Sequence, residues 1–463
     1  MTTQIAGYEV ECVQGPEEIR YRKDELIVLC LVRDGEPWVR SFVEHYFSLG
    51  AKHIIFLDND STDDTVSVAS EYDNVTVLLT KLPFGGVGKT EGQNLMRQYL
   101  IERFGRNRWS LCVDIDELFD YPYSDVIGID SLLGYLDSKS YTAVAAQMLD
   151  MFPETLAVNS TQRAVTELKK EYRFYDVSEI DRSKPKKEKQ SNIIESDEVA
   201  IAVRGGIRDN VFGFKPLLTK YPLVLSDGTL EHMGVHSIRN ARVADLTCVL
   251  FHYKLYAFAL QDYWYKAIEF KRGRGPFMKR RYEQYMEVLK ENPELQLNLE
   301  STREIASVND LLENGFLVAS EDYIGWVNVE EEKEIWQANP QSKSNELTEA
   351  LLESKRQERA KTLTMGRLEQ GLLEHRRQEQ IKDQTIKKLK QQKRKQGRNI
   401  SELEKRIVDQ GQKIQRLRHR RQRLTKQNNR LRQQLANVAA SRVWKLVQTL
   451  RHIKGRLKSR SWS

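Results

Sequence analysis

Residues 25–33 read ELIVLCLVR, and this apolar run decides the fold class. An unbroken apolar run of this length is typical of a strand that is buried on both faces of a parallel sheet. A helix pattern follows it, because Pro37 suits a first helical turn, apolar residues recur at helical spacing from Trp38 to Phe47, and Gly50 suits the helix end. The stretch therefore predicts a strand-to-helix unit.

The same unit repeats along the next part of the chain. We expect further strands at 53–59, 75–80 and 109–117, and further helices at 62–72 and 91–104. Strand and helix that alternate four times within about 95 residues predict an α/β fold, with a mostly parallel sheet and helices on both faces. Ligands of such sheets bind at the carboxyl ends of the strands, where this sequence places its polar clusters.

The charges of the chain are divided unevenly. Residues 341–463 contain 34 Lys and Arg against 11 Asp and Glu, whereas residues 1–340 contain 39 and 55. This division predicts an acidic globular body joined to a basic tail. Such a tail attracts phosphate groups, on nucleic acid, on anionic lipid or on an acidic partner.

Within the tail, apolar residues recur with a period of seven. The a positions are Ile400, Ile407, Ile414, Arg421, Asn428 and Leu435, and the d positions are Leu403, Gln410, Leu417, Leu424, Leu431 and Val438. Ile at a with Leu at d favours two parallel strands, and one Asn at a fixes their register. We therefore predict a coiled coil over 341–440 and a homodimer, with a single solvated helix as the alternative.

The last segment, 441–463, places apolar residues on one helical face and Lys and Arg opposite. Such a helix lies on an anionic membrane or packs against a partner protein. The four cysteines are scattered without a C-x-x-C pair, so a reducing compartment is expected. With no secretory signal and no run of 18 apolar residues, we expect a cytoplasmic protein, peripheral at the inner face of the membrane.

Two acidic clusters follow predicted strands. Asp58 and Asp60 come after the second strand, where a carboxylate can accept hydrogen bonds from a ribose or base, although a capped helix start explains them equally. Asp114 and Asp116 close the fourth strand and would project from one face, about 7 Å apart at the backbone. Like charges so close favour a divalent cation between them, unless water screens them.

Together, these motifs resemble those of a known protein family. Residues 24–270 resemble family 2-like glycosyltransferases of the GT-A fold. The resemblance rests on LVRDGEPWVRSFVEHYFSLGAKHIIFLDNDSTDDT, on EGQN, on W-x-L-x-V-D-I-D-E-L, and on later segments such as RGGIR and VLFHYKL. RDGE at 33–36 departs from the K-N-E sequence usual there. The resemblance implies an N-terminal extension at 1–23 and a GT-A domain at 24–340, with a nucleotide-sugar-binding half at 24–140 and an acceptor half at 141–340.

The resemblance also implies transfer of a sugar from a nucleotide-sugar donor, with inversion and with Mn²⁺ or Mg²⁺. Asp58 would bind the base or ribose, with Arg33 and Asp60 nearby. Asp114 and Asp116 would be the D-x-D pair that holds the metal against the diphosphate. The remaining residue of the implied metal site is His252.

Other residues have weaker assignments. Asp209 is the first candidate for the general base, with Asp150 and Glu154 behind it. Lys89, in PFGGVGKT at 83–90, is placed near the donor diphosphate. His236 is a further candidate ligand, and the alternative for either histidine is a core residue bound to a backbone carbonyl.

The sequence is consistent with three functions. The first is a glycosyltransferase acting on a glycan, lipid-linked or protein acceptor, and nucleic acid is not expected as its partner. The second is a non-catalytic coiled-coil adaptor with a polyanion-binding tail. The third is a P-loop nucleotide hydrolase, since PFGGVGKT differs from the P-loop pattern only at Pro83. The donor sugar, the acceptor and the linkage depend on the shape of the pocket.

Overall fold

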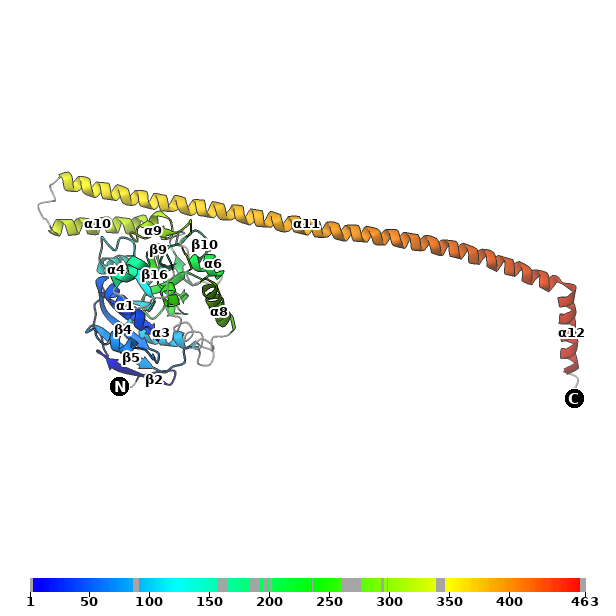
Figure 1. The fold of residues 1–463 in the computed structure, drawn as a ribbon, viewed down its shortest axis with the longest axis horizontal. Coiled ribbons are helices and arrows are strands. Elements are labelled where there is room, and N and C mark those ends of the chain that lie inside the picture. The colour runs from blue at the N-terminus through cyan, green and yellow to red at the C-terminus, as the bar shows by residue number, and fades with distance from the viewer. Residues whose placement is uncertain are drawn as a thin grey trace. The chain divides into compact units, whose positions relative to one another are not determined.

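The computed structural model describes residues 3–85, 91–155, 165–183, 191–194, 196, 198–199, 202–232, 234, 236–259, 276–292, 295–297, 299–338 and 346–458. The chain forms two compact units, Met1–Leu373 and Glu374–Ser463. The first unit contains the sheet and most of the helices, and the second is helical (Figure 1).

A mixed sheet forms the centre of the first unit. In spatial order its strands are β1 (Thr3–Ile5), β2 (Tyr8–Gln14), β5 (Val75–Thr80), β4 (Ala51–Asp58), β3 (Leu26–Val32), β6 (Trp109–Asp114), β13 (Thr219–Leu225), β8 (Ala143–Asp150), β16 (Arg242–His252) and β11 (Ile193–Ile194), with β7 (Glu117–Asp120) paired to β16. The neighbours β5, β4, β3 and β6 are parallel, and so are β8 and β16. This arrangement confirms the predicted α/β class.

Helices connect these strands and continue beyond them along the chain. They are α1 (Glu36–Ser48), α2 (Thr65–Ala69), α3 (Gly92–Phe104), α4 (Ile129–Ser138), α5 (Val165–Glu171), α6 (Ile207–Phe212), α8 (Pro276–Glu291), α9 (Asp310–Glu313), α10 (Glu321–Ala338), α11 (Glu346–Ala440) and α12 (Arg442–Lys458). Short strand pairs lie outside the main sheet: β10 (Ile180–Ser183) with β12 (Ala202–Gly205), β14 (Glu231–His232) with β15 (Ile238–Arg239), and β9 (Phe174–Tyr175) with β17 (Arg303–Glu304).

Strand β3 shows why the opening sequence is apolar without interruption. All seven of its residues are buried, and successive side chains enter different layers. Val28 and Cys30 belong to the same core cluster as Phe42 of α1, whereas Leu29 packs in a second cluster with Leu100 of α3. Because side chains alternate across a strand, a strand covered by helices on both faces needs apolar residues at every position.

Two segments differ from their predictions. The segment treated as an N-terminal extension contributes β1 and β2 to the edge of the main sheet, where β2 is antiparallel to β5. The strand predicted over 109–117 ends at Asp114, and a turn leads into β7, which pairs with β16 instead of continuing beside β3. The amide of Tyr253 donates to the carbonyl of Asp116 (2.8 Å) and fixes this turn.

Helix α1 fixes the position of β7 through hydrogen bonds from two of its side chains to the backbone of β7. The hydroxyl of Tyr46 donates to the carbonyl of Glu117 and accepts from the amide of Phe119, both at 2.9 Å. His45 lies beside it, with Nε2 at 2.7 Å from the carbonyl of Phe119 and Nδ1 at 3.3 Å from Nζ of Lys169. These contacts require a neutral imidazole that donates through Nε2 and accepts through Nδ1. They hold Glu117 at its place in the sheet.

The first turns of α11 belong to the globular unit. Leu352 and Leu363 are buried, and Arg359 forms an ion pair with Glu331 of α10 (2.6 Å). A Cβ built at Gly366 would lie 2.2 Å from the carbonyl oxygen of Leu312, so the two backbones approach too closely for any larger residue. Packing of this kind anchors the start of the long helix.

The later part of α11 presents an unpaired apolar stripe. From Ile400 to Val438, the Ile, Leu and Val residues of the predicted a and d positions are 51–69% exposed. Exposure of a long, regular apolar stripe marks an interaction surface. Among the residues that the structure describes, no helix combines the length and apolar character that crossing a bilayer requires.

We expect stability to depend on pH through His45. Burial, followed by the charge of Lys169, lowers the pKa of His45 to about 3 from 6.5. Between these values the unfolded chain binds a proton that the folded chain does not, so the free energy of unfolding falls as the pH falls, by up to about 1.4 kcal/mol per pH unit. The stability difference between wild type and His45→Gln, measured by urea unfolding from pH 7 to pH 4, should shrink with this slope. A constant difference contradicts the assignment.

We also predict that a second copy covers the stripe of α11. Leu417→Gln with Leu424→Gln keeps the helix propensity but removes apolar burial of about 1.5–3 kcal/mol per leucine, so the dimer should dissociate to monomer at micromolar concentration. Sedimentation equilibrium measures the mass. His419→Gln with Lys426→Gln, outside the a and d positions, is the matched control and should remain a dimer. A monomeric wild type would refute the prediction.

Candidate functional site

The acidic residues named from the sequence lie at one edge of the sheet. Asp58 ends β4 and pairs in register with Val32, while Asp114 ends β6 and pairs with Leu31 on the other side of β3. Two strand spacings separate them, about 10 Å. This edge is formed by the carboxyl ends of parallel strands, where α/β proteins bind their ligands.

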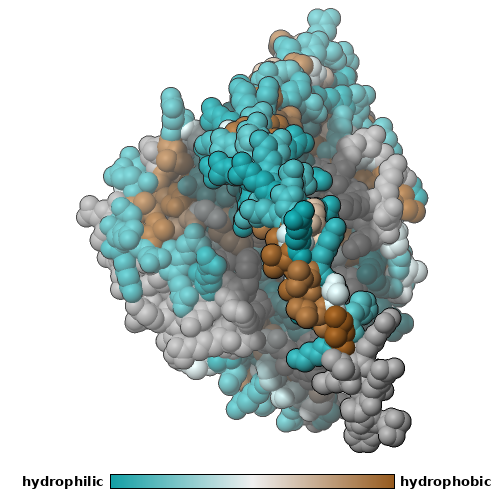
Figure 2. All heavy atoms as spheres, turned by 90° about the vertical axis from the view of Figure 1, so that its right-hand side faces the viewer, coloured by the Kyte–Doolittle hydropathy of each residue, from teal (hydrophilic) through white to brown (hydrophobic). Residues whose placement is uncertain are grey.

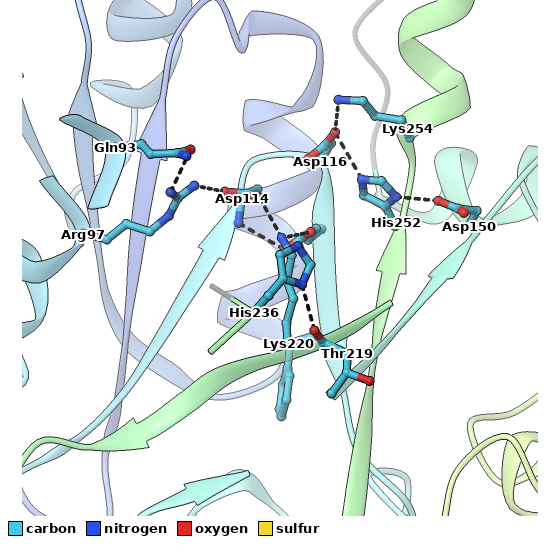
Figure 3. A network of polar contacts seen from close by, with 12 residues as sticks. Gln93, Arg97, Asp114, Asp116, Asp150, Thr219, Lys220, His236, His252 and Lys254 are labelled. Atoms are coloured by element: carbon cyan, nitrogen blue, oxygen red, sulfur yellow. Dashed lines mark hydrogen bonds and ion pairs between the residues drawn. The ribbon is translucent and has the colours of Figure 1, made fainter. Parts of the chain in front are cut away.

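Asp114 is held between two cations (Figure 3). Its carboxylate accepts from Arg97 of α3 at 2.5 Å and from Nζ of Lys220 at 2.7 Å. Lys220 also donates to Glu117 at 2.5 Å. Three strands, β6, β7 and β13, therefore meet at one buried ammonium group.

The charges of this group depend on one another. Burial would raise the pKa of Asp114, but Lys220 and Arg97 outweigh it and hold the pKa below its usual range. Burial raises the pKa of Glu117 and is opposed by Lys220. The two carboxylates in turn raise the pKa of Lys220 against its own burial. Lys220 thus stays charged and is the cation that allows both acids to lie close together.

Asp116 belongs to a second group. Nδ1 of His252 lies 2.5 Å from the carboxylate of Asp150, which also accepts from Nε of Arg208 at 2.7 Å. Nε2 of His252 is turned toward Asp116, 3.6 Å from Oδ2, and Lys254 donates to the same oxygen at 3.2 Å. Figure 3 shows the imidazole between the two carboxylates.

In this second group, too, neighbouring charges outweigh the effect of burial on the pKa values. Burial lowers the pKa of His252, but Asp116 and Asp150 reverse that effect and raise it. Burial would raise the pKa of Asp150, yet Arg208 and His252 lower it to about 2. Against the same effect of burial, Lys254 and His252 hold the pKa of Asp116 well below its usual range. A carboxylate as acidic as Asp150 is suited to orienting His252 rather than to accepting a proton from a substrate.

The residues present fit a divalent metal. Among the described residues, Asp116, Glu117 and His252 offer ligand atoms that all lie within 4.8 Å of one another. Metal-bound histidines usually donate their second ring nitrogen to a carboxylate, as Nδ1 of His252 does to Asp150. Oxygen and imidazole ligands suit Mn²⁺ and related ions. Of the three ligands named from the sequence, Asp116 and His252 lie together, whereas Asp114 is bound by Arg97 and Lys220.

The residues named for the donor are placed as follows. Asp58 is buried, and its carboxylate accepts from the amide and the hydroxyl of Ser61. Arg33 donates to the carbonyl of Asn59 at 3.0 Å. Asp60 is exposed and has a left-handed backbone (φ 63°). Lys89 lies outside the described residues. The role of these residues toward a nucleotide stays a prediction.

The remaining candidates lie around these groups. Asp209 on α6 is 3.9 Å from Lys215, which also pairs with Asp181. The imidazole of His236 lies 2.7 Å from the carbonyl of Thr219, but the residue is exposed and therefore not a core histidine. Glu154 follows β8 at its carboxyl end and accepts at its carbonyl from the amide of Leu297.

Sequence reasoning missed most of the cations. Arg97, Lys220, Lys254 and Glu117 are not among the residues that the sequence predicts for the site. A signal for Lys220 exists, since it stands in the otherwise apolar strand TKYPLVL and a lysine buried there needs an acidic partner. The identity of that partner depends on strands that are far apart in the sequence.

Comparisons with known proteins give little. No family model matches the sequence, and no curated protein does. A crystal structure of S. aureus TarS residues 1–349 matches with a TM-score of 0.22 and 16% identity over 28% of this chain and 40% of that chain. A second TarS structure matches with 0.22 and 18% over 28% and 24%. UTP-bound UGPase from Acinetobacter baumannii matches with 0.18 and 11% over 35% and 62%. All three matches span less than two thirds of the other chain, and similarities this small carry no weight for fold or function.

We predict that Lys220→Met destabilises the fold in a pH-dependent way. Removing one partner of a buried ion group costs about 3–5 kcal/mol, because Asp114 and Glu117 are left close together without their shared cation. The cost should be largest at pH 8 and smaller at pH 5, where the already raised pKa of Glu117 allows it to bind a proton. Urea unfolding at both pH values measures it.

Lys254→Met is the matched control, because Lys254 is the more exposed of the two lysines and pairs with Asp116, whereas Lys220 joins Asp114 and Glu117. It should cost less than Lys220→Met at both pH values. Equal losses for the two variants would contradict the central role of Lys220.

Proposed function

We propose that this protein is a divalent-metal-dependent glycosyltransferase, which moves a sugar from a nucleotide-sugar donor to an acceptor with inversion. One observation supports this most directly. His252 is fixed by Asp150 so that its Nε2 faces Asp116 across 3.6 Å, with Glu117 beside them, at the carboxyl edge of an α/β sheet. Of these residues, Asp116 belongs to the D-x-D pair of the family resemblance and His252 to its VLFHYKL segment.

Each residue has a defined task in this proposal. Asp116, Glu117 and His252 would hold the metal, and Asp150 with Arg208 orients the imidazole. Arg97 and Lys220 offset the charges of Asp114 and Glu117, so that these carboxylates do not repel a diphosphate bound at this edge. The metal, when bound, stabilises the negative charge of the departing nucleoside diphosphate.

Proton transfer from the acceptor also needs a carboxylate. Asp209 remains the candidate, since it lies on α6 next to Arg208, which binds Asp150. Its side chain is partly exposed, near Lys215, and so can be reached by an acceptor. A homodimer through α11 and a glycan, lipid-linked or protein acceptor complete the proposal. The adaptor and the P-loop hydrolase are the rivals.

The proposal predicts metal-dependent donor binding. In a thermal-shift panel of nucleoside diphosphate sugars, one donor should raise the melting temperature of the wild type with Mn²⁺ but much less without it. Saturation at 100 times the Kd stabilises by about 2.7 kcal/mol. Asp116→Asn should lose the Mn²⁺-dependent part of this shift and at least about tenfold of any donor turnover.

Asp322→Asn is the matched control, because Asp322 is an exposed carboxylate that pairs with Lys139 on the surface. It should behave as the wild type. If no nucleotide sugar shifts the wild type, or if Asp116→Asn binds and turns over the donor normally, the glycosyltransferase proposal is wrong. A shift by ATP or GTP that Lys89→Ala abolishes would support the P-loop rival.

A further inference from the structure

Helix α12 presents an apolar stripe. Val443, Leu446, Leu450 and Ile453 are 73%, 62%, 56% and 49% exposed. With 100° between successive residues, these four side chains fall within an arc of about 80°. Figure 2 shows brown side chains as a continuous stripe along the helix that ends in the grey terminus. Stripes of this kind mark a binding surface.

The charges of α12 are all of one sign. Its residues 442–458 contain six Lys and Arg (Arg442, Lys445, Arg451, Lys454, Arg456 and Lys458) and no Asp or Glu. Arg442 and Lys454 lie next to the apolar arc on its two sides, by the same 100° spacing. Long basic side chains in these positions can place their stems on apolar surface and their charges in a polar layer.

This charge pattern decides between the possible occupants of the stripe. A second α12 would bring six positive charges against six, with no acid among residues 442–458 to offset them. In α11, Glu402, Glu404 and Asp409 offset some of the basic residues over 402–409, whereas residues 410–440 contain no acid. An anionic bilayer offers both an apolar layer and negative headgroups. The apolar stripe of α12 matches the apolar layer, and its basic residues match the headgroups. The 17 residues of α12 are too short and too charged to cross it.

We propose that α12 is a membrane-binding helix that lies in the interface of an anionic lipid bilayer, with Val443, Leu446, Leu450 and Ile453 in the acyl boundary. Lys445, Arg451 and Lys454 bind lipid phosphate. This inference does not depend on the enzymatic activity. It attaches the chain to a membrane surface through α12.

Co-sedimentation of the full chain with vesicles tests the proposal. Wild type should bind phosphatidylcholine vesicles that contain phosphatidylglycerol, bind pure phosphatidylcholine much more weakly, and be released by salt. Each basic residue near an anionic surface contributes about fivefold, so Lys445→Gln, Arg451→Gln and Lys454→Gln together should lower the partition coefficient on the order of 100-fold. Leu446→Gln with Leu450→Gln keeps the charge and should lower it at least about tenfold.

The matched control removes three charges elsewhere. Lys387→Gln, Lys388→Gln and Arg394→Gln lie on exposed positions of α11, outside its a and d positions, and should leave vesicle binding within about twofold. Three results would overturn the proposal: no binding to anionic vesicles, an equal loss in the α11 control, or an α12 leucine variant that lowers the oligomeric mass while vesicle binding is kept. The last result would show that a second copy covers the stripe.

Discussion

The ammonium group of Lys220 lies buried between the carboxylates of Asp114 and Glu117, and the edge of the sheet depends on it. Both acids stand on strands that the apolar core requires, so neither can move away from the other. Burial alone would drive them to bind protons. Because Lys220 and Arg97 provide the opposite charge, the strand ends keep ionised groups in a place with little water.

In the neighbouring group, two carboxylates again lie close together, but a histidine lies between them instead of a lysine. Asp116 and Asp150 are separated by the imidazole of His252, whose charge depends on the proton it binds. A histidine can exchange that proton for a metal ion, whereas a lysine at its ordinary charge cannot. The difference between the two groups is what makes the His252 side, rather than the Lys220 side, the place for a divalent ion in the proposed enzyme.

The two helical surfaces are proposed to bind different partners for a physical reason. The stripe of α11 follows a regular a and d spacing that suits two identical helices side by side, and Glu402, Glu404 and Asp409 are acids among its flanking charges. The stripe of α12 is flanked by positive charges alone, which favours a negative surface. A dimer would present two copies of α12 to the same bilayer, so the two surfaces would act together even though each is a separate segment.

The sequence by itself determined the α/β class, since residues 26–32 are all apolar, as a strand covered on both faces requires, and the strand-to-helix pattern repeats after them. It also located the acidic strand ends, the histidine of VLFHYKL and the long helix, because these signals lie within short stretches. The tertiary structure decided which charges meet. Lys220 is more than 100 residues from Asp114, and β7 leaves the direction of β6 because Tyr46 and β16 hold it elsewhere. The local periodicity of the sequence cannot predict which distant residues pair, since these pairings depend on the order of strands in the sheet.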